Sequence, residues 1–562
     1  MVKHTTLKTF ILLTILLLWS FPTFAQVDTA WVRRYNGPVN KDDYANSIAV
    51  DGSGNIYVTG YIDGGGVISF DYATIKYSPN GDTAWVRRYN APGNWDDHAF
   101  DVAVDTGGNV YVTGSSYGTG IDPDFSDYAT IKYHPNGDTA WVRRYNGPGN
   151  GRDRACRLAV DDSAYVYVTG RSWDNGTGDD YATIKYSPEG DTVWIRRYNG
   201  PGNGDDWVYG LAVDDSAYVY VTGRSEDSAN FWGYATIKYY PNGDTAWIRR
   251  YNGPIEGMDF AEAIAVDSSG NVYVTGASYG TGIHPDYSDY ATIKYYPNGD
   301  TAWVRRYNRP GNGLDYAKAI AVDSSGNVYV TGFSDSGGSK HDYATIKYYP
   351  DGDTAWARLY NGPGDSTDVA SALQVDSSGN VYVTGGSYGS GTGEDYATIK
   401  YYPNGDTAWV KRYNGPGNGG DGARAMVIDG LGNVYVTGVS EGGETSLDYA
   451  TIKYLQDEVF VEEENQDNIV NSFTLSQNYP NPFNPQTAIE YTLNSPCCVT
   501  LKIYNIRGQL IKALVDVNQN KGFHRITWDG KNEKGEETSS GVYFCRLKAG
   551  DYVITKKMVK LK

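Results

Sequence analysis

Apolar and aromatic residues recur along this chain in short runs that repeat as a group. In the unit that begins at Asp244, four such runs lie at 245–251, 263–267, 271–276 and 290–295, and Gly, Pro, Asn and Asp separate them. Short runs rich in Val, Ile, Thr, Tyr and Trp are typical of strands. None of these runs has the spacing of an amphipathic helix. The unit is therefore predicted to form four short strands.

The same unit occurs eight times between Asp28 and Tyr454. Each copy opens with DTAW, or DTVW once, and its last run reads YATIKY; the opening Asp falls at 28, 82, 138, 191, 244, 300, 353 and 406. A period this regular indicates an array of one supersecondary unit. Four antiparallel strands per unit, repeated about a ring, describe a β-propeller.

The two ends of the array complement each other. The chain enters with a lone first run at 28–35 and leaves with three runs that end at Tyr454. Pairing of 28–35 with 449–454 would close the ring and leave no unpaired edge. We therefore predict an all-β fold: an eight-bladed propeller of four-stranded blades, closed by N-terminal strand exchange, followed by a small C-terminal β-sandwich.

The links between the runs differ in length and composition. DSSGN and PNGD are tight turns in which Gly can take a positive φ, whereas units three and four read DDSAY at 161–165 and 214–218, which predicts a different turn. The links after the first and third runs are long and variable, and both are expected on the same face of the ring. Binding residues usually lie on such loops.

The regions outside the array have their own character. Residues 1–25 carry Lys3 and Lys8 before an apolar stretch and small residues, as a secretory signal peptide does. The expected domains are the signal peptide 1–25, the propeller 26–454, an acidic linker 455–472 and a strand-rich domain 473–562. No stretch of the mature chain predicts a membrane span.

The charge of the chain restricts its possible partners, and its cysteines leave two arrangements open. Residues 1–472 hold 35 Lys and Arg against 60 Asp and Glu, while 473–562 hold 13 against 7. An acidic ring argues against nucleic acid as a partner. Cys156 stands alone in the ring, and Cys545 either bridges Cys497 or Cys498 or stays a small apolar residue.

Two groups of sequence motifs resemble those of known protein families. DSSGNVYVTG followed by DYATIKYYPNGDTAW resembles the bacterial β-propeller repeats called SBBP repeats. The last domain, with NYPNPFNP (478–485), LKIYNIRGQ (501–509), SGVYFCRL (540–547) and KKMVKLK (556–562), resembles the type A C-terminal sorting domain of the type IX secretion system. This second resemblance implies export through the periplasm to the surface or medium, with the secretion machinery as a partner. The positions that carry its sorting motifs are Pro480, Asn481, Pro482, Gly508, Gly541, Tyr543, Lys556 and Lys557.

Candidate ligand-binding residues are those that break the repeat. The tryptophans found in every copy, such as Trp31 and Trp85, are expected to serve the blades. On the variable links, five aromatic side chains are candidates to stack on a glycan or to contact a protein ligand: Trp173, Trp207, Phe231, Trp232 and Trp95.

Catalysis has weaker sequence support than binding. The histidines are scattered, acids occur in every link, and no nucleophile elbow, phosphate loop or HExxH motif occurs. No catalytic residue, metal ligand or cofactor is assigned; calcium on Asp-rich links and a quinone-dependent dehydrogenase, whose blades dock through similar Gly and Trp positions, stay as alternatives. We expect a secreted or surface binding module, and the alternative is a glycan-acting hydrolase or lyase that uses the variable face.

Overall fold

The structure is a computed structural model that describes residues 27–456 and 473–561, apart from 66–68, 93, 118–124, 230, 256, 281–286, 312, 336–339, 476–477, 494–495, 506–508 and 550–551. The predicted signal peptide and nearly all of the linker lie outside the described residues. The described residues form strands and turns, and none of them builds a helix long and apolar enough to cross a bilayer. The chain divides into two compact units, Met1–Val459 and Phe460–Lys562.

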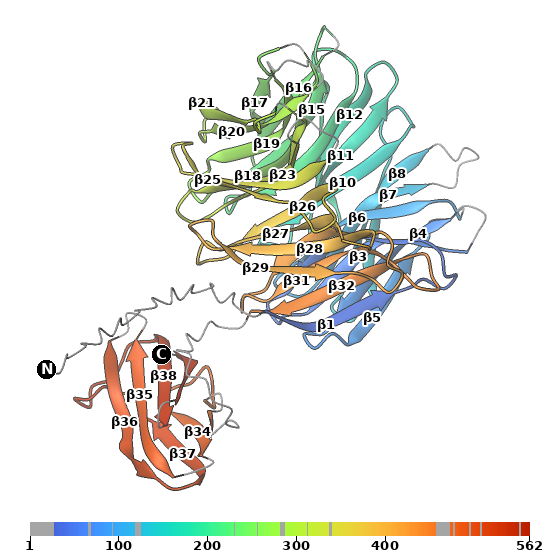
Figure 1. Cartoon of the computed structure of the whole chain (residues 1–562). Helices are drawn as coiled ribbons and strands as arrows, with labels where there is room; N and C mark the ends of the chain where they lie inside the picture. Colours follow the sequence, from blue (N-terminus) through green and yellow to red (C-terminus); the bar gives the residue numbers. More distant parts are fainter. Residues whose placement is uncertain are drawn as a thin grey trace, which may run out of the picture. The chain divides into compact units, whose positions relative to one another are not determined.

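The first unit is a propeller of eight four-stranded antiparallel blades (Figure 1). The strands of each blade run from the innermost to the outermost in chain order. Blade I contains β2 (Asp43–Val50), β3 (Ile56–Asp63), β4 (Phe70–Tyr77) and β5 (Thr83–Tyr89), and blade II contains β6 (Asp97–Val104), β7 (Val110–Tyr117), β8 (Ser126–Tyr133) and β9 (Thr139–Tyr145). Blade III contains β10 (Asp153–Val160), β11 (Val166–Asp174), β12 (Gly178–Tyr186) and β13 (Thr192–Tyr198), and blade IV contains β14 (Asp206–Val213), β15 (Val219–Glu226), β16 (Trp232–Tyr239) and β17 (Thr245–Tyr251).

The remaining four blades follow the same order, except that the last one takes its outer strand from the start of the chain. Blade V contains β18 (Phe260–Val266), β19 (Val272–Tyr279), β20 (Ser288–Tyr295) and β21 (Thr301–Tyr307), and blade VI contains β22 (Asp315–Val322), β23 (Val328–Asp335), β24 (His341–Tyr348) and β25 (Thr354–Tyr360). Blade VII contains β26 (Asp368–Val375), β27 (Val381–Tyr388), β28 (Glu394–Tyr401) and β29 (Thr407–Tyr413), and blade VIII contains β30 (Asp421–Ile428), β31 (Val434–Glu441), β32 (Leu447–Leu455) and β1 (Asp28–Tyr35).

Strand exchange closes the ring as predicted. β1 pairs antiparallel with β32, from Asp28 opposite Leu455 to Tyr35 opposite Tyr449. The inner strands contact one another in turn, and β30 of the last blade contacts β2 of the first. The predicted fold class, including the eight blades, is confirmed.

Neighbouring blades pack through residues that every copy repeats. The second strand of each blade is buried on both faces, as Tyr57 and Val58 illustrate with no exposed surface. The Tyr72 hydroxyl donates to the carbonyl oxygen of Ala129 in the next blade at 3.2 Å. The repeated tryptophans dock the outer strands: the Trp31 indole donates to the Pro79 carbonyl, and a Cβ at Gly81 would approach its ring to 2.9 Å. The repeated positions therefore hold the scaffold together.

The tight turns and the long links lie at opposite ends of the blades, as the strand order requires. One expectation about the turns was wrong. The Ala164 amide donates to the Asp161 carbonyl at 2.9 Å, as the Gly54 amide donates to Asp51 in the first blade. The turn is thus the same, and Ala164 and Ala217 adopt a positive φ, 61° and 60°, where the other copies place glycine. Hydrogen bonds from the turn to the leading Asp hold this backbone in place.

The second unit is a two-sheet β domain with its own core. One sheet has the order β33 (Phe473–Leu475), β34 (Thr487–Leu493) and β37 (Gly522–Trp528), and the other β36 (Leu510–Gln519), β35 (Cys497–Asn505), β38 (Gly541–Ala549) and β39 (Tyr552–Lys560). Trp528 is fully buried between Phe483 and Tyr543. All four cysteines of the chain are free, which answers the question about Cys545 in favour of a buried thiol.

Candidate ligand-binding site

A β-bulge in each inner strand turns one side chain toward the central channel. In β2, Ala45 pairs with Gly60 and Ser47 with Thr59, so that Asn46 between them has no partner in the ladder. A bulge of this kind re-aims a side chain. The opposing glycine of each VTG sequence is required there, because a Cβ at Gly60 would lie 1.9 Å from the Tyr44 carbonyl oxygen.

The residue at the bulge differs from blade to blade. Although YATIKY is identical in every blade, no two blades share a residue at the bulge. From blade I to blade VIII these residues are Asn46, Phe100, Cys156, Tyr209, Glu262, Lys318, Ser371 and Arg424. The repeated scaffold therefore presents eight different side chains around one ring.

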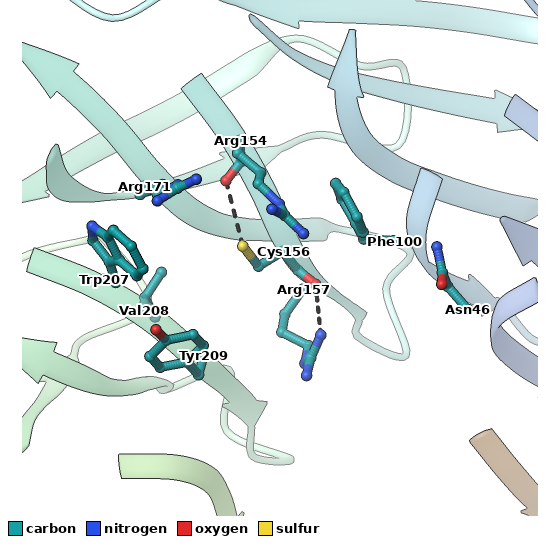
Figure 2. A pocket seen from close by; sticks show the side chains of 9 residues that line it. All are labelled: Asn46, Phe100, Arg154, Cys156, Arg157, Arg171, Trp207, Val208 and Tyr209. Carbon is teal, nitrogen blue, oxygen red and sulfur yellow. Dashed lines mark hydrogen bonds between the residues drawn. The ribbon is translucent and has the colours of Figure 1, made fainter. Parts of the chain in front are cut away.

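The bulge residues of blades I to IV line a single pocket of about 330 Å³. Its lining residues are Asn46, Phe100, Arg154, Cys156, Arg157, Arg171, Trp207, Val208 and Tyr209. All of them except Arg171 come from inner strands, and Arg171 comes from β11. In Figure 2, Cys156 lies with Trp207 on one side of it and Arg154 and Phe100 on the other.

Guanidinium groups contact aromatic rings in the pocket lining and directly beside it. The Arg154 guanidinium lies 4.0 Å from the centroid of Phe100. Trp207 contacts two guanidinium groups, those of Arg171 at 4.4 Å and Arg224 at 3.6 Å from its ring centroid. Arg224 also lies 3.9 Å from Trp232. Cation–π contacts at these distances stabilise the guanidinium groups beside the rings.

The arginines are only partly neutralised by acids. Arg171 lies 3.3 Å from the carboxylate of Asp179. Among the described residues, neither Arg154 nor Arg224 has a carboxylate within ion-pair distance, and the Nε atom of each has no hydrogen-bond partner. Arg224 is 9% exposed, and its burial lowers its pKa. Positive charge is therefore concentrated here within an acidic ring.

One acid lies near Arg157 but its oxygens are already occupied. Asp101 accepts hydrogen bonds from the Ser47 hydroxyl at 2.7 Å and from the Leu158 amide at 3.0 Å. Burial raises the pKa of Asp101, and the charge of Arg157 opposes that shift. Asp101 thus ties three inner strands together and is not among the residues that line the pocket.

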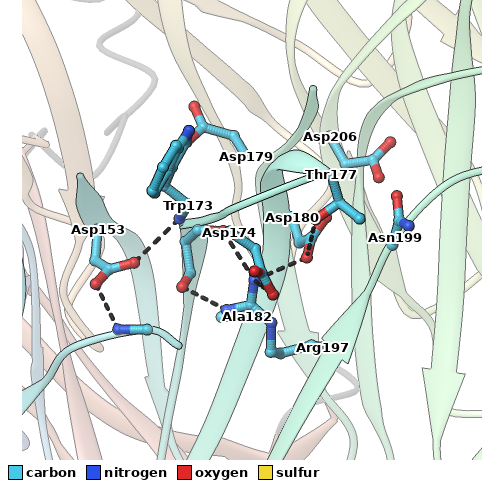
Figure 3. Close-up of polar contacts among 12 residues, drawn as sticks. Asp153, Trp173, Asp174, Thr177, Asp179, Asp180, Ala182, Arg197, Asn199 and Asp206 are labelled. Carbon is cyan, nitrogen blue, oxygen red and sulfur yellow. Dashed lines mark hydrogen bonds and ion pairs between the residues drawn. The ribbon is translucent and has the colours of Figure 1, made fainter. Parts of the chain in front are cut away.

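The structure brings two of the five predicted aromatic residues together. Trp207 lines the pocket, and Trp232 meets it through Arg224. Trp173 packs on the link before β10, where a Cβ at Gly151 would lie 2.3 Å from its ring, and its amide donates to Asp153 (Figure 3). Trp95 and Phe231 are half-buried outside the pocket lining.

Sequence reasoning missed Arg154, Arg171, Arg224, Phe100 and Tyr209. The signal was present, because these positions break the repeat as strongly as any residue of the long links. It was overlooked because the segment before the apolar part of each inner strand was interpreted as link, whereas β14 begins at Asp206.

The second unit joins two of the predicted sorting motifs. The Val559 amide donates to the side-chain oxygen of Asn481 at 2.8 Å, and the Phe483 amide donates to the Val559 carbonyl at 2.9 Å. The segment that includes Pro480 and Pro482 therefore runs along the strand that carries Lys556 and Lys557.

The other predicted sorting residues are less directly connected. Gly541 pairs with Lys560 in the sheet. The Tyr543 hydroxyl donates to the Ser539 carbonyl at 2.7 Å, and its ring packs on Trp528. Gly508 lies outside the described residues.

Comparison with family models confirms the resemblance to SBBP repeats. A model described as a β-propeller repeat matches residues 30–66, 193–231, 247–284 and 302–338. A model described as a FlgD Ig-like domain matches residues 484–551. The second unit therefore carries an Ig-like domain.

Individual proteins show a more distant likeness. An uncharacterized WD repeat-containing protein of Acanthamoeba polyphaga mimivirus is 24% identical over 342 residues, which cover 51% of this chain and about a quarter, 24%, of that protein. Among solved structures, PorZ, a surface component of the type IX secretion system of Porphyromonas gingivalis, is 12% identical with a TM-score of 0.33, and covers 92% of this chain and 81% of PorZ. A fungal alcohol oxidase of the AA5 family is 11% identical with a TM-score of 0.38, and covers 96% of this chain and all of that one (100%). TM-scores this low transfer no function.

Proposed function

We propose that the propeller is an extracellular binding module and that its ligand occupies the pocket at blades I to IV. The observation that carries this proposal is the set of four different bulge residues that meet in one pocket on an otherwise repeated scaffold. A purely structural ring has no need for a different residue at each equivalent position, whereas a ligand contacted from one side does. Small-molecule sites in proteins are concave and carry a few placed polar groups.

A ligand screen on the whole chain tests the proposal. Glycans, small acids and neutral metabolites are compared by thermal shift and calorimetry on the wild type and on Tyr209→Ala. The control is Ser371→Ala, which changes the same bulge position in blade VII. Binding that Tyr209→Ala weakens and Ser371→Ala leaves intact supports the pocket. Binding that depends on neither residue, or turnover of a bound glycan, would contradict the assignment of a binding module at this place.

We further propose that the second unit directs export by the type IX secretion system. The support is the joint presence of the quoted motifs and the contact between the segment of Asn481 and the strand of Lys557. In a host with that system, a chain that ends before Phe473 should accumulate in the periplasm, while the full chain reaches the surface or medium. Equal delivery of both chains would rule out this role.

A further inference from the structure

We infer that the pocket at blades I to IV takes a ring-shaped ligand that carries a carboxylate, such as a uronic acid unit of an acidic glycan. This inference rests on the proposed function, because it names the ligand class for the same pocket. Three observations lead to it: the surplus of positive charge, the unpaired guanidinium donor of Arg154, and the aromatic side chain left beside the arginines.

The charge balance of the lining favours an anion. Arg154, Arg157 and Arg171 line the pocket, and no Asp or Glu among the described residues does. Of these three arginines, only Arg171 has a carboxylate within ion-pair distance among the described residues, namely that of Asp179. The mature ring as a whole is strongly acidic, so this surplus is not a general property of the surface. An anionic group that enters the pocket would supply the missing counter-charge.

The unpaired donors of the arginines favour a carboxylate. The Arg154 Cζ atom lies over the Phe100 ring at 4.0 Å, and the Nε–H group of Arg154 has no hydrogen-bond partner among the described residues. Arg171 lies over Trp207 at 4.4 Å and pairs with Asp179. Two parallel N–H groups match the two oxygens of a carboxylate. Trp207 already contacts the guanidinium groups of Arg171 and Arg224, so its role is to hold the arginines rather than to stack on a sugar.

The rest of the lining suits one ring. Tyr209 belongs to the lining, and its ring makes no aromatic contact among the described residues. An aromatic face of this kind packs on the apolar side of a pyranose. At about 330 Å³ the pocket is at the small end of ligand sites, which fits a single ring better than a chain of rings.

Binding of D-glucuronate, D-glucose and D-glucose 6-phosphate to the full chain tests the inference. These probes share the pyranose ring and differ in the anionic group. We expect glucuronate to bind at least about tenfold more tightly than glucose, and added salt to reduce that difference. Glucose 6-phosphate should bind less tightly than glucuronate, because its anion is tetrahedral.

Charge-neutral variants locate the carboxylate. Arg154→Gln and Arg157→Gln should each remove most of the preference for glucuronate, while Lys318→Gln, at the bulge of blade VI, should keep it. Two separate arginine variants guard against a folding defect, and the melting temperature of each shows whether the ring is intact.

The alternative outcomes are distinguishable. If glucose binds as tightly as glucuronate and Tyr209→Ala weakens both, the pocket is a ligand site but the carboxylate assignment is wrong. If only the phosphate binds, the anion is not a carboxylate and the inference fails. If none of the three probes binds at millimolar concentration, the inference is overturned, while the wider ligand screen still decides the proposed function.

Discussion

Val32 of β1 and Ile452 of β32 lie opposite each other, although 420 positions separate them in the chain. Val32 packs against the core of the last blade, and Trp31 next to it packs between Tyr77 and Tyr435 of the two blades that meet there. The first strand therefore contributes to a blade-to-blade interface as well as to its own sheet. No loop connects this strand directly to another strand of its blade, so noncovalent contacts hold it there.

Removal of residues 28–35 should open the ring at this point. The deletion exposes the edge of β32 and the aromatic side chains that Trp31 covers, and unpaired edges promote association of chains. We expect a melting temperature lower by more than about 10 °C, since a loss of several kcal/mol shifts the transition by a few degrees for each kcal/mol. Thermal denaturation and light scattering measure the two effects.

A point variant provides the matched comparison. Trp31→Ala and Trp85→Ala remove equivalent side chains, each 8% exposed, from the exchanged strand and from a continuous blade. Each should destabilise the ring by about 3–5 kcal/mol. If the deletion of 28–35 left the melting curve of the wild type unchanged, closure by β1 would have no energetic role.

In blade VI, Arg309 makes the contacts that an outer-strand arginine makes in most other blades. In most blades an outer-strand arginine, such as Arg197, bonds a serine and an aspartate of its own blade. Blade VI has Leu359 at that position, and Arg309, which stands where six other copies have glycine, reaches the Ser334 carbonyl at 3.2 Å and Asp342 at 2.5 Å instead. A Cβ at the equivalent Gly147 would collide with Ser172 and approach Arg197. The two substitutions therefore depend on each other.

A double-mutant cycle tests this exchange. Arg309→Gly alone leaves the buried carboxylate of Asp342 without its cation and should cost about 1–3 kcal/mol. Adding Leu359→Arg restores the arrangement of the other blades and should recover most of that loss. Chemical denaturation measures Arg309→Gly, Leu359→Arg and the double variant. If the effects of the two single variants simply add in the double variant, the two positions are independent.

Much of the propeller could be predicted from the sequence because its eight copies report the same local physics. The positions of Trp31 and Tyr72 follow from repetition alone, since a residue needed by every blade recurs in every blade. The closure by β1 followed from counting strands at the two ends. The SBBP resemblance was carried by turns and strands of this repeated kind.

The pocket could not be predicted in the same way. Its residues lie at a bulge, and a bulge breaks the two-residue period from which the facing of side chains is inferred. The stack of Arg171, Trp207 and Arg224 joins two blades, so no local pattern indicates it. The turn at Ala164 was mispredicted for a different reason: several hydrogen bonds to Asp161 outweigh the preference of alanine for negative φ.

That strained turn can be relieved. Ala164 and Ala217 hold a positive φ that costs an L-residue roughly 1–2 kcal/mol, and glycine pays no such cost but loses more chain entropy. Ala164→Gly and Ala217→Gly should therefore stabilise the ring, by up to about 1 kcal/mol each. Gly326→Ala, at the same place in blade VI, should destabilise it. Chemical denaturation gives all three values, and a loss of stability in both glycine variants would contradict the strain.

The ring should become more stable as the pH falls from 8 to about 5. An aspartate opens each inner strand or, in β18, directly precedes it. Burial raises the pKa of Asp43 and Asp315 to about 7 and that of Asp206 to about 6. The unfolded chain releases these protons near pH 4. Between pH 4 and 7 the folded state thus holds protons that the unfolded state has lost, so stability declines as the pH rises through this window.

Calorimetry at constant ionic strength measures the effect as a melting temperature that increases from pH 8 to pH 5. Below pH 4 the trend should reverse, because hydrogen bonds in the tight turns lower the pKa of Asp267 and Asp323, and protonation there removes their contribution. Asp206→Asn removes one proton-binding group and should make the rise shallower. A melting temperature that falls steadily from pH 8 to pH 5 would mean that the backbone hydrogen bonds to these aspartates outweigh their burial.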